Sequence, residues 1–244
     1  MNLIKYQLFC FVVLFINGIS VAQQENPDNF EKYLMGNWID HNGNGTQDPY
    51  ENPHISDEQR VRDLSGRMTL EEKIGQMQQP RRQAVMTDWT LDTSKVRQVI
   101  CEQGVGSFLR VPTRLTPENQ ARVISRLQNI ALGTRLGIPL LFGQNCTYGY
   151  ADMSGASVFP GGLGMASTWD PELVKATARV TAAESGAVGV YWNYNPYLSL
   201  ARDPRWGRTG ETFGEDPYLT SLMGYKQVLG YQGSDLESPS TMMA

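Results

Sequence analysis

Apolar residues recur along this chain with two spacings, and their alternation predicts the secondary structure. Val61, Leu64 and Met68 recur at helical spacing, and Ser56 with Gln59 fits a helix capping box. The pattern predicts helices over residues 57–67, 70–78, 95–103, 116–132, 170–187 and 217–229. Short apolar runs at 105–111, 138–142 and 188–194 predict buried strands.

The predicted strands and helices alternate, which indicates an α/β fold with parallel strands and right-handed crossovers. A (β/α)8 TIM-type barrel and a doubly wound open sheet both fit this order. No Gly-x-Gly-x-x-Gly motif follows a predicted strand, which disfavours the dinucleotide-binding form of the open sheet. The chemically distinctive segments 143–165 and 195–215 follow predicted strands, as functional loops do in barrels, so the pattern favours the barrel.

Only about three clear strands are predicted between residues 56 and 244, whereas a complete barrel takes roughly 250 residues. The last residues, 240–244, resemble the start of another strand. We therefore expect residues 56–244 to form the N-terminal part of a truncated barrel domain, preceded by a leader at residues 23–55.

Composition and charge restrict the class of partner. The chain has 244 residues, of which 41% are hydrophobic and 19% charged, with a net charge of −4 and a pI near 5.3. Nucleic-acid binders usually carry a basic excess, so no nucleic-acid partner is expected. A neutral ligand such as a sugar is compatible with this charge.

The N-terminus has the pattern of a secretory signal peptide over residues 1–22. Lys5 supplies the positive start, Leu8 to Ile16 is apolar, and Ser20-Val21-Ala22 offers small residues for cleavage. An uncleaved anchor is the alternative, although the run is shorter than the roughly 20 residues of a spanning helix. We expect a secreted or periplasmic protein with no membrane span after signal removal.

A block of charged residues near the C-terminal end carries the most specific signal. Arg202-Asp203-Pro204-Arg205-Trp206-Gly207-Arg208 is followed by Glu211 and by Glu215-Asp216-Pro217-Tyr218-Leu219. This block resembles the signature of glycoside hydrolase family 3. Three further segments resemble the family in the same order, at residues 60–77, 137–143 and 159–173.

The resemblance implies a (β/α)8-type first domain and removal of sugars from the non-reducing ends of β-linked glycans. It implies an exo-acting, retaining β-glycosidase resembling a β-glucosidase, a β-linked oligosaccharide or glycoside as substrate, and no organic cofactor. Arg208 would bind hydroxyls of the terminal sugar, a role that suits the five donors of a guanidinium. The alternative for Arg208 is a structural ion pair with Glu211 or Asp216.

The sequence departs from the family pattern after the early strand. Asn145 and Tyr148 stand where the family usually has Asp and His. The family's Asp accepts hydrogen bonds from the sugar, so the resemblance places Asn145 in the substrate site. Asn keeps one acceptor oxygen but loses the charge, and charge-assisted hydrogen bonds are about twice as strong as neutral ones. The substitution therefore implies altered sugar specificity or weak binding.

Retaining β-glycosidases need a nucleophilic carboxylate and an acid. In the family both follow the segment that matches Arg202–Leu219, so we assign no catalytic residue and expect the chain by itself to be inactive. A non-catalytic carbohydrate-binding protein derived from this family is the alternative, supported by Asn145 and Tyr148. A phosphate-binding α/β enzyme is disfavoured because no phosphate-cradling Gly motif is present.

The leader contains a twelve-residue segment, residues 40–51, with the spacing of an EF-hand calcium loop. Gly45 stands at the position of the sharp turn. The pattern assigns calcium-ligand oxygens to Asp40, Asn42, Asn44, the Thr46 carbonyl, Asp48 and bidentate Glu51. No flanking helices are predicted, so a solvated linker rich in turns remains the alternative to a structural Ca²⁺ site.

Overall fold

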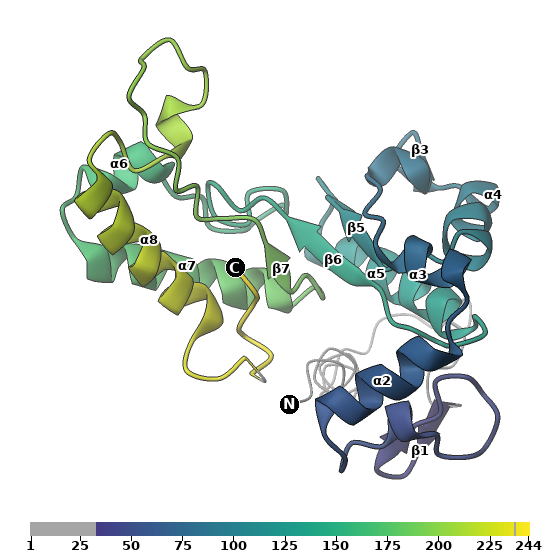
Figure 1. The fold of residues 1–244 in the computed structure, drawn as a ribbon. Helices are drawn as coiled ribbons and strands as arrows, with labels where there is room; N and C mark the ends of the chain where they lie inside the picture. The colour runs from purple at the N-terminus through teal and green to yellow at the C-terminus, as the bar shows by residue number, and fades with distance from the viewer. Residues whose placement is uncertain (1–32, 237) are drawn as a thin grey trace. The chain divides into compact units, whose positions relative to one another are not determined.

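The computed structural model describes residues 33–236 and 238–244 (Figure 1). The predicted signal peptide, residues 1–22, lies outside the described residues, as does the start of the predicted leader. The chain divides into two compact units. The first contains the described chain up to Pro112 and residues Arg122–Phe142, and the second contains Thr113–Ala121 and Gly143–Ala244.

The first unit begins with a short antiparallel hairpin, in which Leu34 pairs with Ile39. A polar loop and a single 3-10 turn lead from this hairpin into the first long helix. The elements up to the end of this unit's first segment are β1 Leu34–Met35, β2 Trp38–Ile39, η2 Pro49–Glu51, α2 Asp57–Arg67, α3 Leu70–Gln76, η3 Arg82–Ala84, β3 Met86–Thr87, β4 Thr90–Leu91, α4 Thr93–Val96, η4 Arg97–Glu102 and β5 Ser107–Leu109.

Capping residues fix where the first two helices begin, and the sequence predicts the one at Ser56. The Ser56 side chain accepts from the Gln59 amide at the start of α2, and the Thr69 side chain accepts from the Glu72 amide at the start of α3. Both capping boxes are complete, so each satisfies backbone donors that the first helical turn leaves free. The predicted helix over 95–103 is present as α4 continued by η4, a π-helix.

Two elements pass from one unit to the other. Helix α5, Pro117–Leu132, agrees with the helix predicted over residues 116–132. Strand β6, Leu141–Gln144, starts beside β5 and ends paired with β7, Trp192–Asn193. The β6–β7 pair is parallel, with Gly143 opposite Trp192 and Gln144 opposite Asn193.

The second unit packs two long helices against each other (Figure 1). Its remaining elements are α6 Gly162–Ala166, α7 Pro171–Gly186, η5 Thr209–Glu211 and α8 Pro217–Gln232. A Cβ on Gly230 of α8 would lie 2.4 Å from the Lys175 carbonyl oxygen of α7, so the close helix contact requires glycine there. Met165, Ala166, Val174, Phe213 and Met223 form a buried apolar cluster under these helices.

The structure confirms an α/β fold with strands followed by helices. The strands are shorter than predicted: β5 covers three residues, β6 is shifted toward the C-terminus, and β7 covers two residues. Trp192 and Met243 form a parallel bridge, which agrees with the expected start of a strand at residues 240–244. The sheet order in the described residues is β5-β6-β7, and a closed barrel remains a prediction.

No helix in the described part of the chain combines the length and the apolar character needed to span a membrane.

Candidate functional site

The candidate substrate residue Asn145 lies directly after β6, in the second unit. Gln144 and Asn193 are paired at the ends of the parallel strands β6 and β7, and both side chains are buried. Asn145 is half-buried at the next position of the chain. The end of the β6–β7 pair therefore fixes where the loop that carries Asn145 begins.

The Asn193 carboxamide connects the two loops that leave this strand pair. Its Oδ1 accepts from the backbone amide of Cys146 at 3.1 Å and from that of Asn195 at 3.1 Å. The Tyr194 amide also donates to the Gln144 carbonyl at 3.2 Å. Asn193 is only 2% exposed, so water does not compete for the hydrogen bonds that its Oδ1 accepts. These bonds hold the starts of the two loops together.

The Cys146 side chain of the same loop is a buried free thiol. Burial raises the pKa of the Cys146 thiol, and the charge of Asp152 adds to this effect. The thiol is therefore neutral at physiological pH and packs as a small apolar group.

Arg208 lies at the start of η5 and is half-exposed. Its guanidinium donates to Glu211 Oε2 through Nε at 3.2 Å and a terminal nitrogen at 2.6 Å, and it lies 4.5 Å from the centroid of the Tyr197 ring. The hydrogen bond to Glu211 raises the pKa of Arg208 above its already high value, so the group is always charged. Glu211, rather than Asp216, is the ion-pair partner; Asp216 instead caps α8 by accepting from the Leu219 amide at 2.7 Å.

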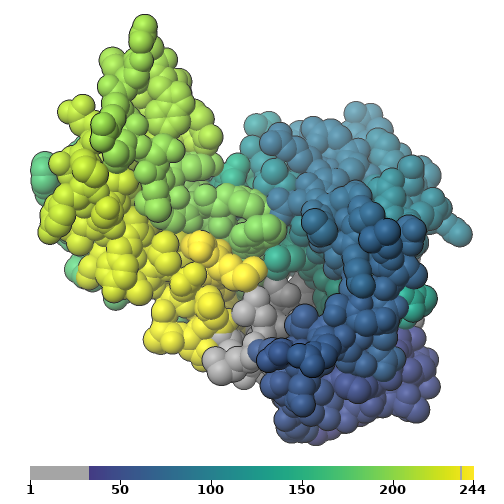
Figure 2. All heavy atoms as spheres, in the orientation of Figure 1, coloured from purple at the N-terminus to yellow at the C-terminus, as the bar shows by residue number. Residues whose placement is uncertain are grey.

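Neighbours of Arg208 in the same segment form contacts that stabilise the loop. Asp203 pairs with Arg205 at 2.6 Å, and the Trp206 carbonyl accepts from the Thr209 hydroxyl at 2.9 Å. The segment around residues 200–210, light green in Figure 2, stands out from the body of its unit. Asp203 and Glu211 are thus each held by an arginine, as expected for groups that shape a loop.

The loop after β6 and the segment after β7 meet at Gly161, just before α6. A Cβ on Gly161 would lie 2.7 Å from the Gly210 carbonyl oxygen and 3.0 Å from a ring carbon of Tyr148. The Tyr148 carbonyl accepts from the Phe159 amide at 3.1 Å, which ties the loop after β6 to the same place. The structure therefore brings the two loops together, although among the described interactions none joins Asn145 to Arg208 directly.

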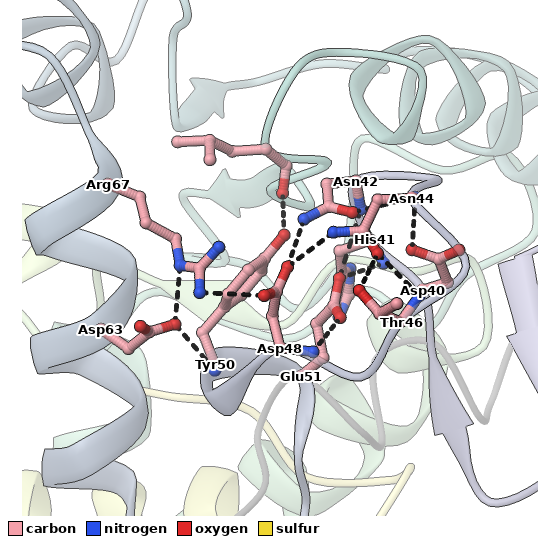
Figure 3. A network of polar contacts seen from close by, with 11 residues as sticks. Asp40, His41, Asn42, Asn44, Thr46, Asp48, Tyr50, Glu51, Asp63 and Arg67 are labelled. Carbon is pink, nitrogen blue, oxygen red and sulfur yellow. Dashed lines mark hydrogen bonds and ion pairs between the residues drawn. The ribbon is translucent and has the colours of Figure 1, made fainter.

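The six predicted calcium ligands lie in the first unit, between β2 and η2 (Figure 3). Five of them contribute side-chain oxygens to one polar network, and the sixth, Thr46, donates to Asn44 Oδ1 through its amide and its hydroxyl. Within the described residues, no group of three or more His, Cys, Asp and Glu side chains is arranged to hold a metal ion.

Three residues that shape the site were not singled out from the sequence: Gly161, Asn193 and Tyr197. Asn193 lies within the predicted strand 188–194. Gly161 lies in Pro160-Gly161-Gly162, a sequence typical of a turn, so a local signal was present for Gly161 alone. The contacts of Asn193 with Cys146 and of Gly161 with Gly210 join segments far apart in the sequence, which a local pattern does not reveal.

Comparison with known proteins gives a consistent result. The model of the "glycosyl hydrolase family 3 N terminal domain" matches residues 69–243. A periplasmic β-glucosidase/β-xylosidase from Dickeya chrysanthemi is 36% identical over 207 residues, covering 79% of this chain and 31% of the relative. A periplasmic β-glucosidase from Salmonella typhimurium is 36% identical over 174 residues, or 71% of this chain and 20% of the relative.

Solved structures show the same likeness. A β-glucosidase involved in saponin metabolism from intestinal bacteria is 42% identical with a TM-score of 0.59, covering 75% of this chain and 22% of that one. The Listeria innocua β-glucosidase in complex with isofagomine is 35% identical with a TM-score of 0.64, covering 77% of this chain and 25% of that one. The chain thus spans less than a third of the length of each of these relatives.

Proposed function

Because the chain belongs to glycoside hydrolase family 3, we propose that it forms the sugar-binding part of an exo-acting, retaining β-glycosidase of the β-glucosidase type. The meeting of the loop after β6 and the segment after β7 at Gly161 carries this proposal. Loops that follow parallel strands and meet at one place form substrate sites in (β/α)8 barrels. The substrate is a β-linked oligosaccharide or glycoside, and no organic cofactor takes part.

Arg208 and Asn145 bind hydroxyl groups of the terminal sugar. Arg208 keeps donors free for a ligand because its two bonds to Glu211 use only part of its five-donor fork. The Tyr197 ring and Glu211 hold the guanidinium in place, so binding orders few additional rotamers. Asn145 offers one acceptor and two donors from a backbone fixed by Asn193.

Hydrolysis with retention needs one carboxylate as the nucleophile and a second carboxyl group as the acid. We assign neither role within the described residues, because Asp203 and Glu211 are held by arginines and Asp216 caps a helix. The 244-residue chain by itself is therefore proposed to bind sugar without hydrolysing it. The Trp192–Met243 bridge supports a further parallel strand beside β7, as a (β/α)8 barrel requires.

The proposed location is outside the cytoplasm, secreted or periplasmic, after removal of residues 1–22. The signal pattern supports this, and two relatives are periplasmic enzymes by name. Mass spectrometry of the exported protein should give an N-terminus at Gln23. An N-terminus at Met1 in the membrane fraction would instead support the uncleaved anchor.

Calorimetric titration with glucose tests the sugar site. The 244-residue chain should bind glucose, and Arg208→Met should weaken binding about tenfold or more, since one hydrogen bond to a charged group contributes about 1.5–3 kcal/mol. Arg205→Met is the matched control: it removes an arginine of the same segment whose ion-pair partner, among residues 33–236 and 238–244, is Asp203. Equal weakening by both variants, or none by either, would contradict the assigned role of Arg208.

Asn145→Asp distinguishes altered specificity from a residue without sugar contact. Restoring a carboxylate should increase the affinity for glucose because the bond to a sugar hydroxyl becomes charge-assisted. An affinity that stays unchanged in both Asn145→Asp and Asn145→Ala would remove Asn145 from the site.

A non-catalytic carbohydrate-binding protein is the second candidate, favoured by Asn145 and Tyr148. Hydrolysis of nitrophenyl β-glucoside and β-xyloside by the full-length protein, purified from its source organism, separates the two. Release of nitrophenol supports the glycosidase. Glucose binding without any release supports the binding protein.

A further inference from the structure

The loop between β2 and η2 holds buried negative charge without a balancing cation. Asp40 is 2% exposed and Glu51 is 3% exposed. Neither carboxylate forms an ion pair with a Lys, Arg or His side chain of the described residues; of the loop's acidic side chains, Asp48 alone is paired, with Arg67 at 2.9 Å. Burying a carboxylate is costly unless a cation compensates it.

Backbone amides donate to both of these side chains. Asp40 accepts from Asn44 at 3.1 Å and Gly45 at 2.8 Å, whereas Glu51 accepts from His41 at 2.8 Å, Asn42 at 3.3 Å and Asp48 at 2.9 Å. These bonds orient the carboxylates but leave their net charges in place. Each ionised carboxylate has about four acceptor positions, so both retain capacity for a further partner.

The loop is bound to structured parts of its unit on two sides. Tyr50 donates to the Leu136 carbonyl at 3.3 Å, and His41 Nδ1 lies 3.1 Å from the Gly137 oxygen. A Cβ on Gly137 would lie 1.6 Å from the His41 carbonyl oxygen, and Gly137 has a φ of +55°, so glycine is required at this contact. On the other side, Arg67 of α2 binds Asp48 and Asp63 at 2.9 Å each (Figure 3). A solvated linker would not have its carboxylates buried or its backbone packed in this way.

We propose that residues 40–51 bind one Ca²⁺ ion through Asp40, Asn42, Asn44, the Thr46 carbonyl, Asp48 and Glu51. Two independent observations support this: the twelve-residue ligand spacing and the two buried carboxylates that lack a cation. Gly45 has a φ of +75°, which suits the sharp turn at the sixth position of such loops. An all-oxygen set with a bidentate carboxylate fits Ca²⁺ better than the smaller Mg²⁺.

Binding requires a local rearrangement. Asn42 and Asn44 both donate from Nδ2 to Asp48 Oδ2, at 2.7 and 2.9 Å. Each amide must turn its oxygen toward the ion, which releases Asp48 as a ligand. Because the Asn42 and Asn44 amides occupy Asp48, the acidic side chains of the loop are not arranged around a common metal position in the described residues. The bound ion would connect the β1–β2 hairpin with η2 and so fix the loop against α2 and Gly137.

Calorimetric titration of the EDTA-treated protein with CaCl₂ tests the proposal. The loop should bind one Ca²⁺ with a Kd of roughly 10⁻⁵ to 10⁻³ M, the range from sensor loops to extracellular modules. Saturating Ca²⁺ should also raise the melting temperature above that in EDTA, and an equal concentration of MgCl₂ should raise it less. Identical melting in Ca²⁺ and EDTA, together with no heat of binding, would overturn the proposal.

Matched variants assign the binding to this loop. Glu51→Gln should abolish the Ca²⁺-dependent shift, whereas Glu58→Gln, which removes an equal charge from the exposed surface of α2, should retain it. If Glu51→Gln does not fold, Asn44→Ala provides the second variant, because Asn44 is exposed and its loss should weaken Ca²⁺ binding about tenfold or more without unfolding the chain. A full shift in Asn44→Ala and Glu51→Gln would place any bound ion elsewhere.

Luminescence of Tb³⁺, a Ca²⁺ substitute, gives a separate readout. Trp38 lies two residues before Asp40, so excitation of Trp38 should sensitise Tb³⁺ bound in the loop. Added Ca²⁺ should displace the signal, and Trp38→Phe should remove it. The light is chosen to excite Trp and not Tyr, because Tyr50 of the same loop also sensitises Tb³⁺; a Trp-excited signal that persists in Trp38→Phe would contradict binding at this loop. None of these measurements depends on sugar binding, so the calcium site and the sugar site are tested separately.

Discussion

Some residues of the candidate site can be identified from the sequence, and others only from the structure. Arg208 and Asn145 stand out because they belong to a recognisable motif and to a departure from one. Asn193 does not stand out, because its role consists of bonds to Cys146 and Asn195 that arise only when two strands pair. Gly161 lies in a sequence typical of a turn, but the sequence does not show that its backbone contacts Gly210.

Gly161→Ala tests this meeting point. The backbone of Gly161, with a φ of −66°, suits alanine, so any effect comes from the added methyl group, 2.7 Å from the Gly210 oxygen. We expect a loss of about 1–3 kcal/mol in the free energy of unfolding, as for overpacked sites, and weaker glucose binding. Chemical denaturation and calorimetric titration measure the two effects.

Gly207→Ala is the matched control for this variant. A Cβ on Gly207 would have no neighbouring atom within 4 Å, so both the stability and the glucose affinity should remain as in the wild type. Equal behaviour of the two alanine variants would show that the loops do not depend on close packing at Gly161.

At the scale of elements, the helices were predicted more accurately than the strands. Capping residues and periodicity are local signals, and α2 and α5 have close to the predicted bounds. The ends of a strand depend on where a neighbouring strand supplies hydrogen bonds. Within the apolar run 188–194, only Trp192–Asn193 pairs with β6, so only these two residues form a strand. The hairpin and 3-10 turn of residues 34–51 were not predicted. This segment is held by contacts of His41 with Gly137 and of Tyr50 with Leu136, which are far apart in the sequence.

Helix α3 supplies a pH-dependent contact. Glu72 completes the α3 capping box and accepts from Arg135 Nε at 2.9 Å. The hydrogen bond from Arg135 holds the pKa of Glu72 below its usual 4.5. The stabilisation is therefore fully present above the unfolded-state pKa and is lost as the pH falls through the lower folded-state pKa.

The melting temperature of the wild type should therefore decrease between about pH 5 and pH 3, and part of this decrease should be absent in Glu72→Gln. Glu71→Gln, at the exposed neighbouring position, should keep the full pH dependence of the wild type. The role of Glu72 is refuted if the two variants lose the same share of it.

At the scale of the whole molecule, the family assignment was predictable and the architecture only in part. Four motifs in the expected order indicated glycoside hydrolase family 3, and the matching N-terminal domain model over residues 69–243 confirms it. The α/β class follows from the order of strands and helices. Barrel closure requires pairing among strands beyond the β5-β6-β7 order of the described residues, so it remains a proposal.

The central claim is that the loop with Asn145 and the segment with Arg208 bind the same pyranose ring. A crystal structure of the protein with bound glucose tests it most directly. We predict that ring hydroxyls lie within about 3.2 Å of both the Asn145 carboxamide and the Arg208 guanidinium. Glucose bound by one of these side chains with the other pointing elsewhere, or glucose bound away from both, would contradict the account.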